Sequence, residues 1–308
     1  MYTVRLHHTL TGKAAGKSMS STVWGKVGTL LEMIKFSHTV FAFPFALMGA
    51  TLAALASGRP PTAGQVLWIC LAMVGARTAA MGLNRIIDAR IDAQNPRTAG
   101  RPLPAGKVSL FESWLLVIVA AALLLLAAAM LNPLCLALAP VALGCFVLYA
   151  YCKRFTALAH LVLGICLAAA PVGAWIALRG DVDWPVLALG AAVLLWVAGF
   201  DIFYALQDVD FDRSQGLHSI PVRLGVRNAI LLGKLLHGAM IALLLLLPLG
   251  LPLGWLYYAG LAVISVLIAY EHQLVKPDDL SRLDAAFFNM NGYVSVTIFL
   301  FTLADALL

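Results

Sequence analysis

Charged residues are scarce in this 308-residue chain. Only 12% of its residues are Asp, Glu, Lys or Arg, whereas soluble domains carry about a quarter. Hydrophobic residues make up 62%, and the mean hydropathy is +0.91. These values exclude a water-soluble globular protein. Because a membrane-spanning helix needs about 20 mainly apolar residues, the chain has room for roughly eight to ten spans and for no second, soluble domain.

Cysteine motifs and a secretion signal are also missing. The five cysteines occur singly in or beside apolar runs, without C-x-x-C spacing, and are interpreted as small buried hydrophobic residues. Residues 1–37 lack the apolar core of a secretion signal and contain five basic residues. We expect them to form a basic cytoplasmic tail that leads into the first helix, followed by a single transmembrane domain at 38–306.

Long apolar stretches predict an all-α, polytopic membrane protein with nine transmembrane helices. The predicted spans are 38–57, 63–84, 109–131, 133–152, 157–178, 185–207, 228–250, 252–270 and 285–306. Short connections join them, so successive spans are expected to alternate in direction.

The net charge of +6 could indicate a nucleic-acid partner, anionic lipid or a sided membrane topology. With the tail placed inside, eighteen of the 21 basic residues fall in the tail and the internal loops. Arg59 and Arg179 fall outside, and Arg77 lies within the second span. The positive-inside rule predicts a cytoplasmic N-terminus in the inner (plasma) membrane. Because the charge follows one membrane face, we expect membrane lipid, and no nucleic acid, as a partner.

Two acidic triads of matching spacing end two of the predicted spans. They are Asn84, Asp88 and Asp92 in the second span and Tyr204, Asp208 and Asp212 in the sixth. Residues four apart share a helical face. Corresponding members lie 120 residues apart, and four spans separate the triads, so both are expected on the same side of the membrane. An internal duplication with two pseudo-repeated halves facing each other explains this pattern, and the carboxylates could then converge on one site.

Neighbouring carboxylates repel each other, so a cation is expected between the triads. Oxygen ligands without His or Cys suit a hard ion such as Mg²⁺, which takes one or two carboxylates and completes its shell with water and phosphates. The alternative is that the acidic residues only solvate helix ends and pair with nearby arginines. For one D-x-x-x-D pair that alternative is preferable, but two pairs in register favour the metal.

Several basic residues have no obvious partners: two follow the second span and two follow the fourth. Arg97, Arg101, Lys153 and Arg154 could grip phosphate oxygens, or they could simply anchor the internal loops. Arg77 lies about two turns before Asn84 on the same face, where a charge is costly unless it lines a polar cavity or is paired. We therefore assign Arg77 an interior role.

Four sequence motifs give a family resemblance. They are N-R-x-x-D-x-x-x-D from Asn84, R-T-x-x-R-P-L-P from Arg97, K-R-F-T from Lys153 and D-x-x-Y-A-x-x-D-x-x-x-D from Asp201. With them the chain resembles the UbiA superfamily of intramembrane aromatic prenyltransferases, and within it the 4-hydroxybenzoate polyprenyltransferase group of quinone biosynthesis. Segments 35–44 and 76–81 resemble a bacterial branch assigned to menaquinone synthesis.

The resemblance implies nine helices around a central cavity, Mg²⁺ as cofactor, a polyprenyl diphosphate donor and an aromatic acid acceptor. Asn84 and the metal ligands Asp88, Asp92, Asp208 and Asp212 would bind Mg²⁺ and diphosphate. The basic residues Arg97, Arg101, Lys153 and Arg154 would neutralise the leaving group. Tyr204 stands where some relatives have an amide or an acid, so it is expected to donate a hydrogen bond to diphosphate instead of binding metal.

The reaction expected from this arrangement is electrophilic aromatic substitution on a phenol. Asp201 is our candidate for removing a proton from the acceptor, and Arg77 for binding an acceptor carboxylate. His38, His160 and His237 are interpreted as satisfied polar groups in packed helices. The rival functions are a secondary transporter, which usually binds at the midplane in broken helices, and a non-catalytic scaffold for other quinone enzymes, which would not need two metal-type motifs.

Overall fold

The regular elements of the described chain are helices, as the composition predicts. The computed structural model describes residues 19–35, 42–276, 280, 283 and 290–308. A helix overlaps each of the nine predicted spans, and the second of these helices runs ten residues beyond the predicted end at 84. These helices are α2 (Phe43–Ser57), α3 (Ala63–Gln94), α4 (Leu110–Leu131), α5 (Pro133–Cys152), α6 (Ala159–Arg179), α7 (Trp184–Ala205), α10 (Val226–Leu246), α11 (Trp255–Leu274) and α13 (Asn291–Ala306).

Six of these helices are long and apolar enough to cross a membrane. They are α3, α4, α5 and α6, together with α7 extended to Ser214 and α10 extended to Leu249. By contrast, α2 and α13 have only 15 and 16 residues. The all-α polytopic architecture is therefore confirmed, while nine spans and two repeated halves stay predictions.

Polar residues at the connections set where several helices begin and end. Thr62 and Ser109 form capping boxes at the starts of α3 and α4, each with the residue three positions on. Asn132 ends α4 and caps α5 through its side chain, so one residue turns the chain. Gly58 and Gly180 end α2 and α6 in the left-handed conformation, which glycine adopts without steric strain.

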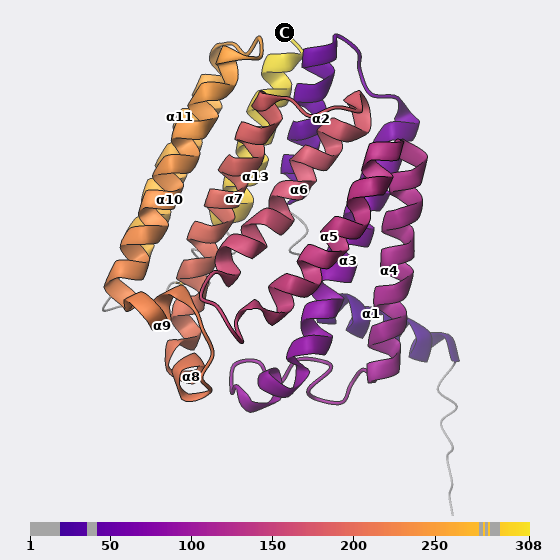
Figure 1. Ribbon diagram of the computed structural model, residues 1–308, viewed down its shortest axis with the longest axis vertical. Coiled ribbons are helices and arrows are strands. Elements are labelled where there is room, and N and C mark those ends of the chain that lie inside the picture. Colours follow the sequence, from indigo (N-terminus) through magenta and orange to yellow (C-terminus); the bar gives the residue numbers. More distant parts are fainter. Residues whose placement is uncertain (1–18, 36–41, 277–279, 281–282, 284–289) are drawn as a thin grey trace, which may run out of the picture.

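The helices alternate in direction, so the longer loops gather at one end of the bundle (Figure 1). This loop end holds residues 95–109, the turn at 153–158 and the segment with α8 (Val209–Ser214) and α9 (Ile220–Leu224). The C-terminus lies at the opposite end. Both acidic triads therefore finish at the same end, as their spacing predicts.

Two packed groups of helices hold the bundle together. One contains the fully buried Trp175, Trp196 and Tyr257 and joins α2, α6, α7, α10, α11 and α13. The other packs α3 against α4 and α5 around Leu83 and Phe146. A smaller cluster around Ala46, Ile69 and Ala174 joins α2, α3 and α6 and so connects the two groups. The helices α3 and α7, which carry the acidic triads, therefore belong to one bundle.

Large apolar side chains also cover the outside of the bundle. Ile118 is 61% exposed and Val266 68% exposed, and Val119 and Val141 are similar. Water would disfavour such a surface by about 25 cal/mol per Å² of apolar area, whereas lipid tails match it. The outer faces therefore fit a membrane-embedded protein.

The predicted tail at 1–37 contains a helix that the sequence did not reveal. This helix, α1 (Met19–Met33), lies at the loop end, and the Lys26 ammonium pairs with Glu112 of α4. Its last carbonyl, Met33 O, accepts a hydrogen bond from Arg85 Nε at 3.3 Å. Residues 1–18 lie outside the described residues, and the boundary at 37/38 stays a prediction.

A close contact between α6 and α7 gives the first prediction. A Cβ at Gly164 would lie 2.5 Å from the carbonyl oxygen of Leu194, whereas one at Gly173 of the same helix would meet nothing within 4 Å. Gly164→Ala should therefore lower the free energy of unfolding by about 1–3 kcal/mol, because the backbones must separate. Gly173→Ala should be neutral or stabilising. Thermal unfolding in detergent measures both, and equal unfolding temperatures for the two variants would contradict the contact.

Candidate active site

A cavity of about 610 Å³ at the loop end brings the predicted residues together. Its lining includes Arg77, Asn84, Asp88, Asp92, Arg97, Arg101, Lys153, Asp201, Tyr204, Asp208 and Asp212. Arg154 alone of the predicted set is not part of the lining. The cavity lies where α3 and α5 meet α6 and α7, so residues far apart in sequence share one polar space.

Asp88 is buried among cations from the turn after α5. Its side chain is 5% exposed, with Lys153 Nζ at 2.6 Å and Arg154 Nη2 at 3.1 Å. Asn84, one turn earlier on α3, donates to Asp88 at 3.1 Å. Arg154 also donates to the carbonyl of Ile87 at 2.8 Å, which holds its guanidinium against α3. A buried carboxylate is stable only when it is paired and hydrogen-bonded in this way.

Asp92 has a separate set of cations. Arg101 Nη1 lies 2.7 Å and Arg85 Nη1 3.8 Å from Asp92 Oδ2. Arg85 is only 8% exposed and also lines the cavity. The sequence interpretation missed Arg85, although it is the second residue of the first motif, because its charge could equally have pointed to solvent.

Asp208 forms a bidentate ion pair with Arg97. Arg97 Nε donates to Asp208 Oδ1 at 2.9 Å, and Nη2 pairs with the other carboxylate oxygen. Arg97 Nη1 also donates to the Tyr204 hydroxyl at 2.8 Å, and Asn95 Nδ2 donates to Asp208 Oδ1 at 2.9 Å. Burial acts to lower the pKa of Arg97, but the hydrogen bonds and charges of Asp208 and Tyr204 outweigh it and raise the pKa. Arg97 is therefore a permanent cation.

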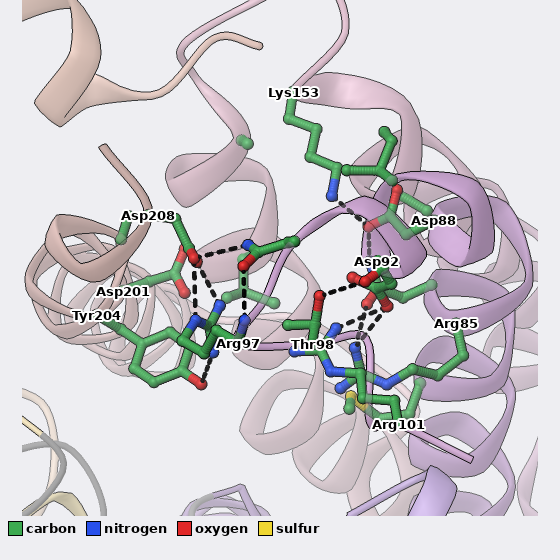
Figure 2. A pocket seen from close by; sticks show the side chains of 18 of the residues that line it. Arg85, Asp88, Asp92, Arg97, Thr98, Arg101, Lys153, Asp201, Tyr204 and Asp208 are labelled. Carbon is green, nitrogen blue, oxygen red and sulfur yellow. Dashed lines mark hydrogen bonds and ion pairs between the residues drawn. The ribbon is translucent and has the colours of Figure 1, made fainter. Parts of the chain in front are cut away.

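The segment 95–101 links the two acidic triads. Figure 2 shows Arg97 directed to Asp208 and Tyr204, and Arg101 directed to Asp92. The segment is fixed to the end of α3, because Asn95 Oδ1 accepts from the amide of Arg97 at 2.9 Å and Thr98 Oγ1 donates to the carbonyl of Asp92 at 3.0 Å. Two arginines four positions apart thus reach different triads.

The second triad does not lie on one continuous α-helical face, and that expectation was wrong. The α-helix ends at Ala205, residues Leu206–Asp208 form a 3-10 turn, and α8 begins at Val209. A 3-10 turn changes the angular spacing of side chains. Asp212 nevertheless lines the same cavity and forms no ion pair with the residues that the structure describes.

The oxygen donors in the cavity fit a magnesium ion that shares its shell with a ligand. Among the described residues there is no group of three or more His, Cys, Asp or Glu side chains that could hold a metal. Mg²⁺ rarely uses such a cage and usually takes one or two carboxylates together with phosphate oxygens and water. Pairs of carboxylates from the triads match that requirement. The magnesium site itself stays a prediction.

Two further groups lie along the wall of the cavity. Arg77 lines it from α3, and its buried Nε has no hydrogen-bond partner in the described part of the chain. His160 lines it from α6 and is hydrogen-bonded to Asp201, with Nδ1 2.6 Å from Oδ2. His237 is fully buried and bonded to His272 and to the carbonyl of Trp196, which agrees with a structural role. His38 lies outside the described residues.

Comparison with known proteins identifies the family. The model of the UbiA prenyltransferase family matches residues 42–293. The chain belongs to the UbiA prenyltransferase family. It is therefore a prenyltransferase, as the motifs predict, and the transporter and scaffold readings lose their support. Family membership and the apolar helices together indicate a membrane-embedded protein.

Named relatives and solved structures agree with this assignment. The 4-hydroxybenzoate octaprenyltransferase of Vibrio cholerae is 33% identical over 222 residues, covering 72% of this chain and 78% of the relative. The enzyme of the same name from Enterobacter sp. is 32% identical, covering 82% and 88%.

Among solved structures, an apo UbiA homologue from Aeropyrum pernix K1 is 37% identical. It has a TM-score of 0.79 and covers 87% of this chain and 98% of its own. A UbiA homologue from Archaeoglobus fulgidus bound to GPP and Mg²⁺ is 20% identical with a TM-score of 0.64, covering 91% of this chain and 100% of its own. The latter likeness shows the shared fold.

The contact between Arg97 and Asp208 gives a second prediction. Arg97→Gln should lower the free energy of unfolding by about 1.5–3 kcal/mol, because hydrogen bonds to a charged partner are lost and Asp208 is left in a partly buried place. Arg90→Gln is the matched control, since Arg90 is exposed on the same helix end. Thermal unfolding in detergent compares them. Equal loss in both variants would show that the Arg97 contact does not stabilise the fold.

Proposed function

We propose that the chain transfers a polyprenyl group from a polyprenyl diphosphate to a 4-hydroxybenzoate-type aromatic acid in quinone biosynthesis. The observation that carries this proposal is the single cavity in which two acidic triads, the 95–101 arginines and Arg77 meet. Support comes from the relatives named 4-hydroxybenzoate octaprenyltransferase and from the homologue bound to GPP and Mg²⁺. The alternative is a UbiA-type transfer to a different acceptor.

The diphosphate end of the donor would occupy the charged part of the cavity. Arg97, Arg101 and Lys153 would donate to its oxygens, with arginine binding in bidentate fashion and lysine as a point charge. Arg154 would act from behind Asp88, because it does not line the cavity. Asn84 and the Tyr204 hydroxyl would contact the same group.

The carboxylates Asp88, Asp92, Asp208 and Asp212 would hold Mg²⁺. When bound, Mg²⁺ supplies electrostatic stabilisation of the negative charge on diphosphate. The chain's own cations do the same, and such stabilisation in a site shielded from water is usually the largest contribution to catalysis.

The reaction would proceed by electrophilic aromatic substitution. The allylic C–O bond breaks and its electron pair leaves with diphosphate. The ring carbon beside the phenol hydroxyl then forms the new C–C bond, and the hydrogen on that carbon departs as a proton. Asp201, which lines the cavity, is the proposed proton acceptor. The surrounding membrane protects the allylic cation from water.

The acceptor would be oriented by Arg77. Arg77 lines the cavity and its Nε has no partner among the described residues, so the guanidinium would pair with a carboxylate on the acceptor. An unpaired buried guanidinium is unfavourable, so a bound carboxylate satisfies both groups. Arg77 would thus favour aromatic acids over neutral phenols.

The donor explains a location in the inner membrane. Each buried CH₂ favours transfer out of water by about 0.8 kcal/mol, so a tail of many carbons resides in the bilayer. The loop end carries most of the basic residues, so by the positive-inside rule this end and the active site would face the cytoplasm. Both ubiquinone and menaquinone synthesis are compatible with these residues.

The test of the function is direct product analysis. Purified protein is incubated with octaprenyl or geranyl diphosphate, a panel of phenolic acids including 4-hydroxybenzoate, and Mg²⁺, and the products are identified by mass spectrometry. We expect a C-prenylated acid that is lost with EDTA and restored by added Mg²⁺. Asp88→Ala should abolish product formation. Product formed equally well in EDTA would contradict the magnesium assignment, and absence of any prenylated acid would contradict the function.

Arg77 gives a separate prediction about the acceptor. Arg77→Ala should raise the KM for an acidic acceptor roughly 10- to 100-fold, because a charge-assisted hydrogen bond is lost, with little change in the KM for the donor. Arg90→Ala, at an exposed position of the same helix, is the control. Steady-state kinetics measures both values. An unchanged acceptor KM would remove Arg77 from the acceptor site.

A further inference from the structure

His160 and Asp201 form a hydrogen-bonded pair in the cavity wall, away from the arginine and lysine contacts. His160 is 4% exposed on α6, and its Nδ1 lies 2.6 Å from Oδ2 of Asp201 on α7. Both residues line the cavity. The distance is short for a nitrogen–oxygen hydrogen bond, which is typical when one partner is charged.

The contact at the second ring nitrogen of His160, Nε2, indicates which nitrogen of the imidazole carries the hydrogen. The amide of Ile220 points to His160 Nε2 at 3.4 Å, and a backbone amide can only donate. Nε2 therefore acts as an acceptor and bears no hydrogen. The proton of the neutral imidazole is then on Nδ1, which donates to Asp201. His160 is thus a hydrogen-bond donor to the Asp201 carboxyl group.

Asp201 differs from the other motif carboxylates in its partner. Asp88, Asp92 and Asp208 each have an arginine or lysine within 4.0 Å, whereas Asp201 has no such cation among the described residues and is hydrogen-bonded to His160. Only Oδ2 of Asp201 has a hydrogen-bond partner among the described residues, so Oδ1 is available to accept a proton.

The charged and titratable groups around the pair come from four elements. Tyr149 of α5 interacts electrostatically with Asp201, and Asp212 of α8 with His160. Lys153 after α5 acts on Asp212, and Arg77 of α3 lines the same cavity. These groups are the same in wild-type protein and in variants at His160. A kinetic change seen only in the variants therefore reports on the His160–Asp201 hydrogen bond.

We propose that His160 is a positioning residue that holds the Asp201 carboxylate oriented to take the ring proton of the prenylated acceptor. The inference rests on the function proposed above. After the new C–C bond forms, the electron pair of the ring C–H bond restores aromaticity, and the proton moves to Asp201 Oδ1. Throughout this step His160 keeps its own proton on Nδ1.

The test compares His160→Leu with His160→Asn. Asparagine can place an amide donor near the position of Nδ1, whereas leucine cannot donate. Rates are measured with octaprenyl diphosphate, Mg²⁺ and 4-hydroxybenzoate, either normal or deuterated at the two ring carbons beside the hydroxyl. For His160→Leu we expect kcat to fall roughly 10- to 100-fold, as for other residues that orient a functional group. The donor KM should stay nearly constant.

Two signatures separate this role from a purely structural one. Slow proton loss should make the deuterated acceptor react more slowly than the normal one in His160→Leu and in Asp201→Asn, but not in wild-type protein. His160→Asn should restore most of kcat and remove the isotope effect.

The possible outcomes are distinct. Wild-type protein that forms no prenylated acid would overturn the proposed function and the role of His160 with it. Active wild-type protein with a His160→Leu variant that shows no isotope effect would overturn the His160 role alone. If His160→Leu fails to fold, the same comparison is made between wild-type protein, His160→Asn and Asp201→Asn. An isotope effect absent from Asp201→Asn would then reject the proton transfer.

Discussion

Pairing of buried carboxylates with cations from distant segments is the constraint on which this structure depends. Asp88 and Asp92 lie on α3 with little exposure to solvent, where an unpaired charge is strongly unfavourable. Their partners come from the turn after α5 and from the segment after α3. The helices can therefore pack only in arrangements that bring these loops back over the cavity. Fold and active site are specified by the same contacts.

The cavity separates two kinds of chemistry. Arginines and lysines surround Asp88, Asp92 and Asp208, where phosphate charge would be balanced. Asp201 instead pairs with a histidine, and Arg77 supplies a guanidinium farther along α3. This division matches a reaction in which charge develops on a leaving group and a proton is removed elsewhere. Charge stabilisation and proton removal need carboxylates with different partners. Asp208 and Asp201, which differ in this way, lie seven residues apart in the sequence.

Much of this arrangement could be predicted because it depends on local periodicity. Apolar runs located the helices, and triads with four-residue spacing located both halves of the cavity. The partners could not be predicted, since Arg97 and Asp208 are 111 residues apart and their contact depends on packing. The 3-10 turn at Leu206–Asp208 was missed because acidic side chains at four-residue spacing fit a helix equally well. His160 gave no local signal, because its partner lies on another helix.

The short link between the triads also restricts how this enzyme can vary. Within 95–101, Arg97 and Arg101 bind opposite walls of the cavity, while Asn95 and Thr98 fix the backbone to the end of α3. A deletion or insertion of one residue between the arginines would rotate one of them away from its carboxylate. Ala99 and Gly100 contribute no side-chain bond to this network, and Gly100 lines the cavity with its backbone. Selection should therefore act on the length of the segment more strongly than on its composition.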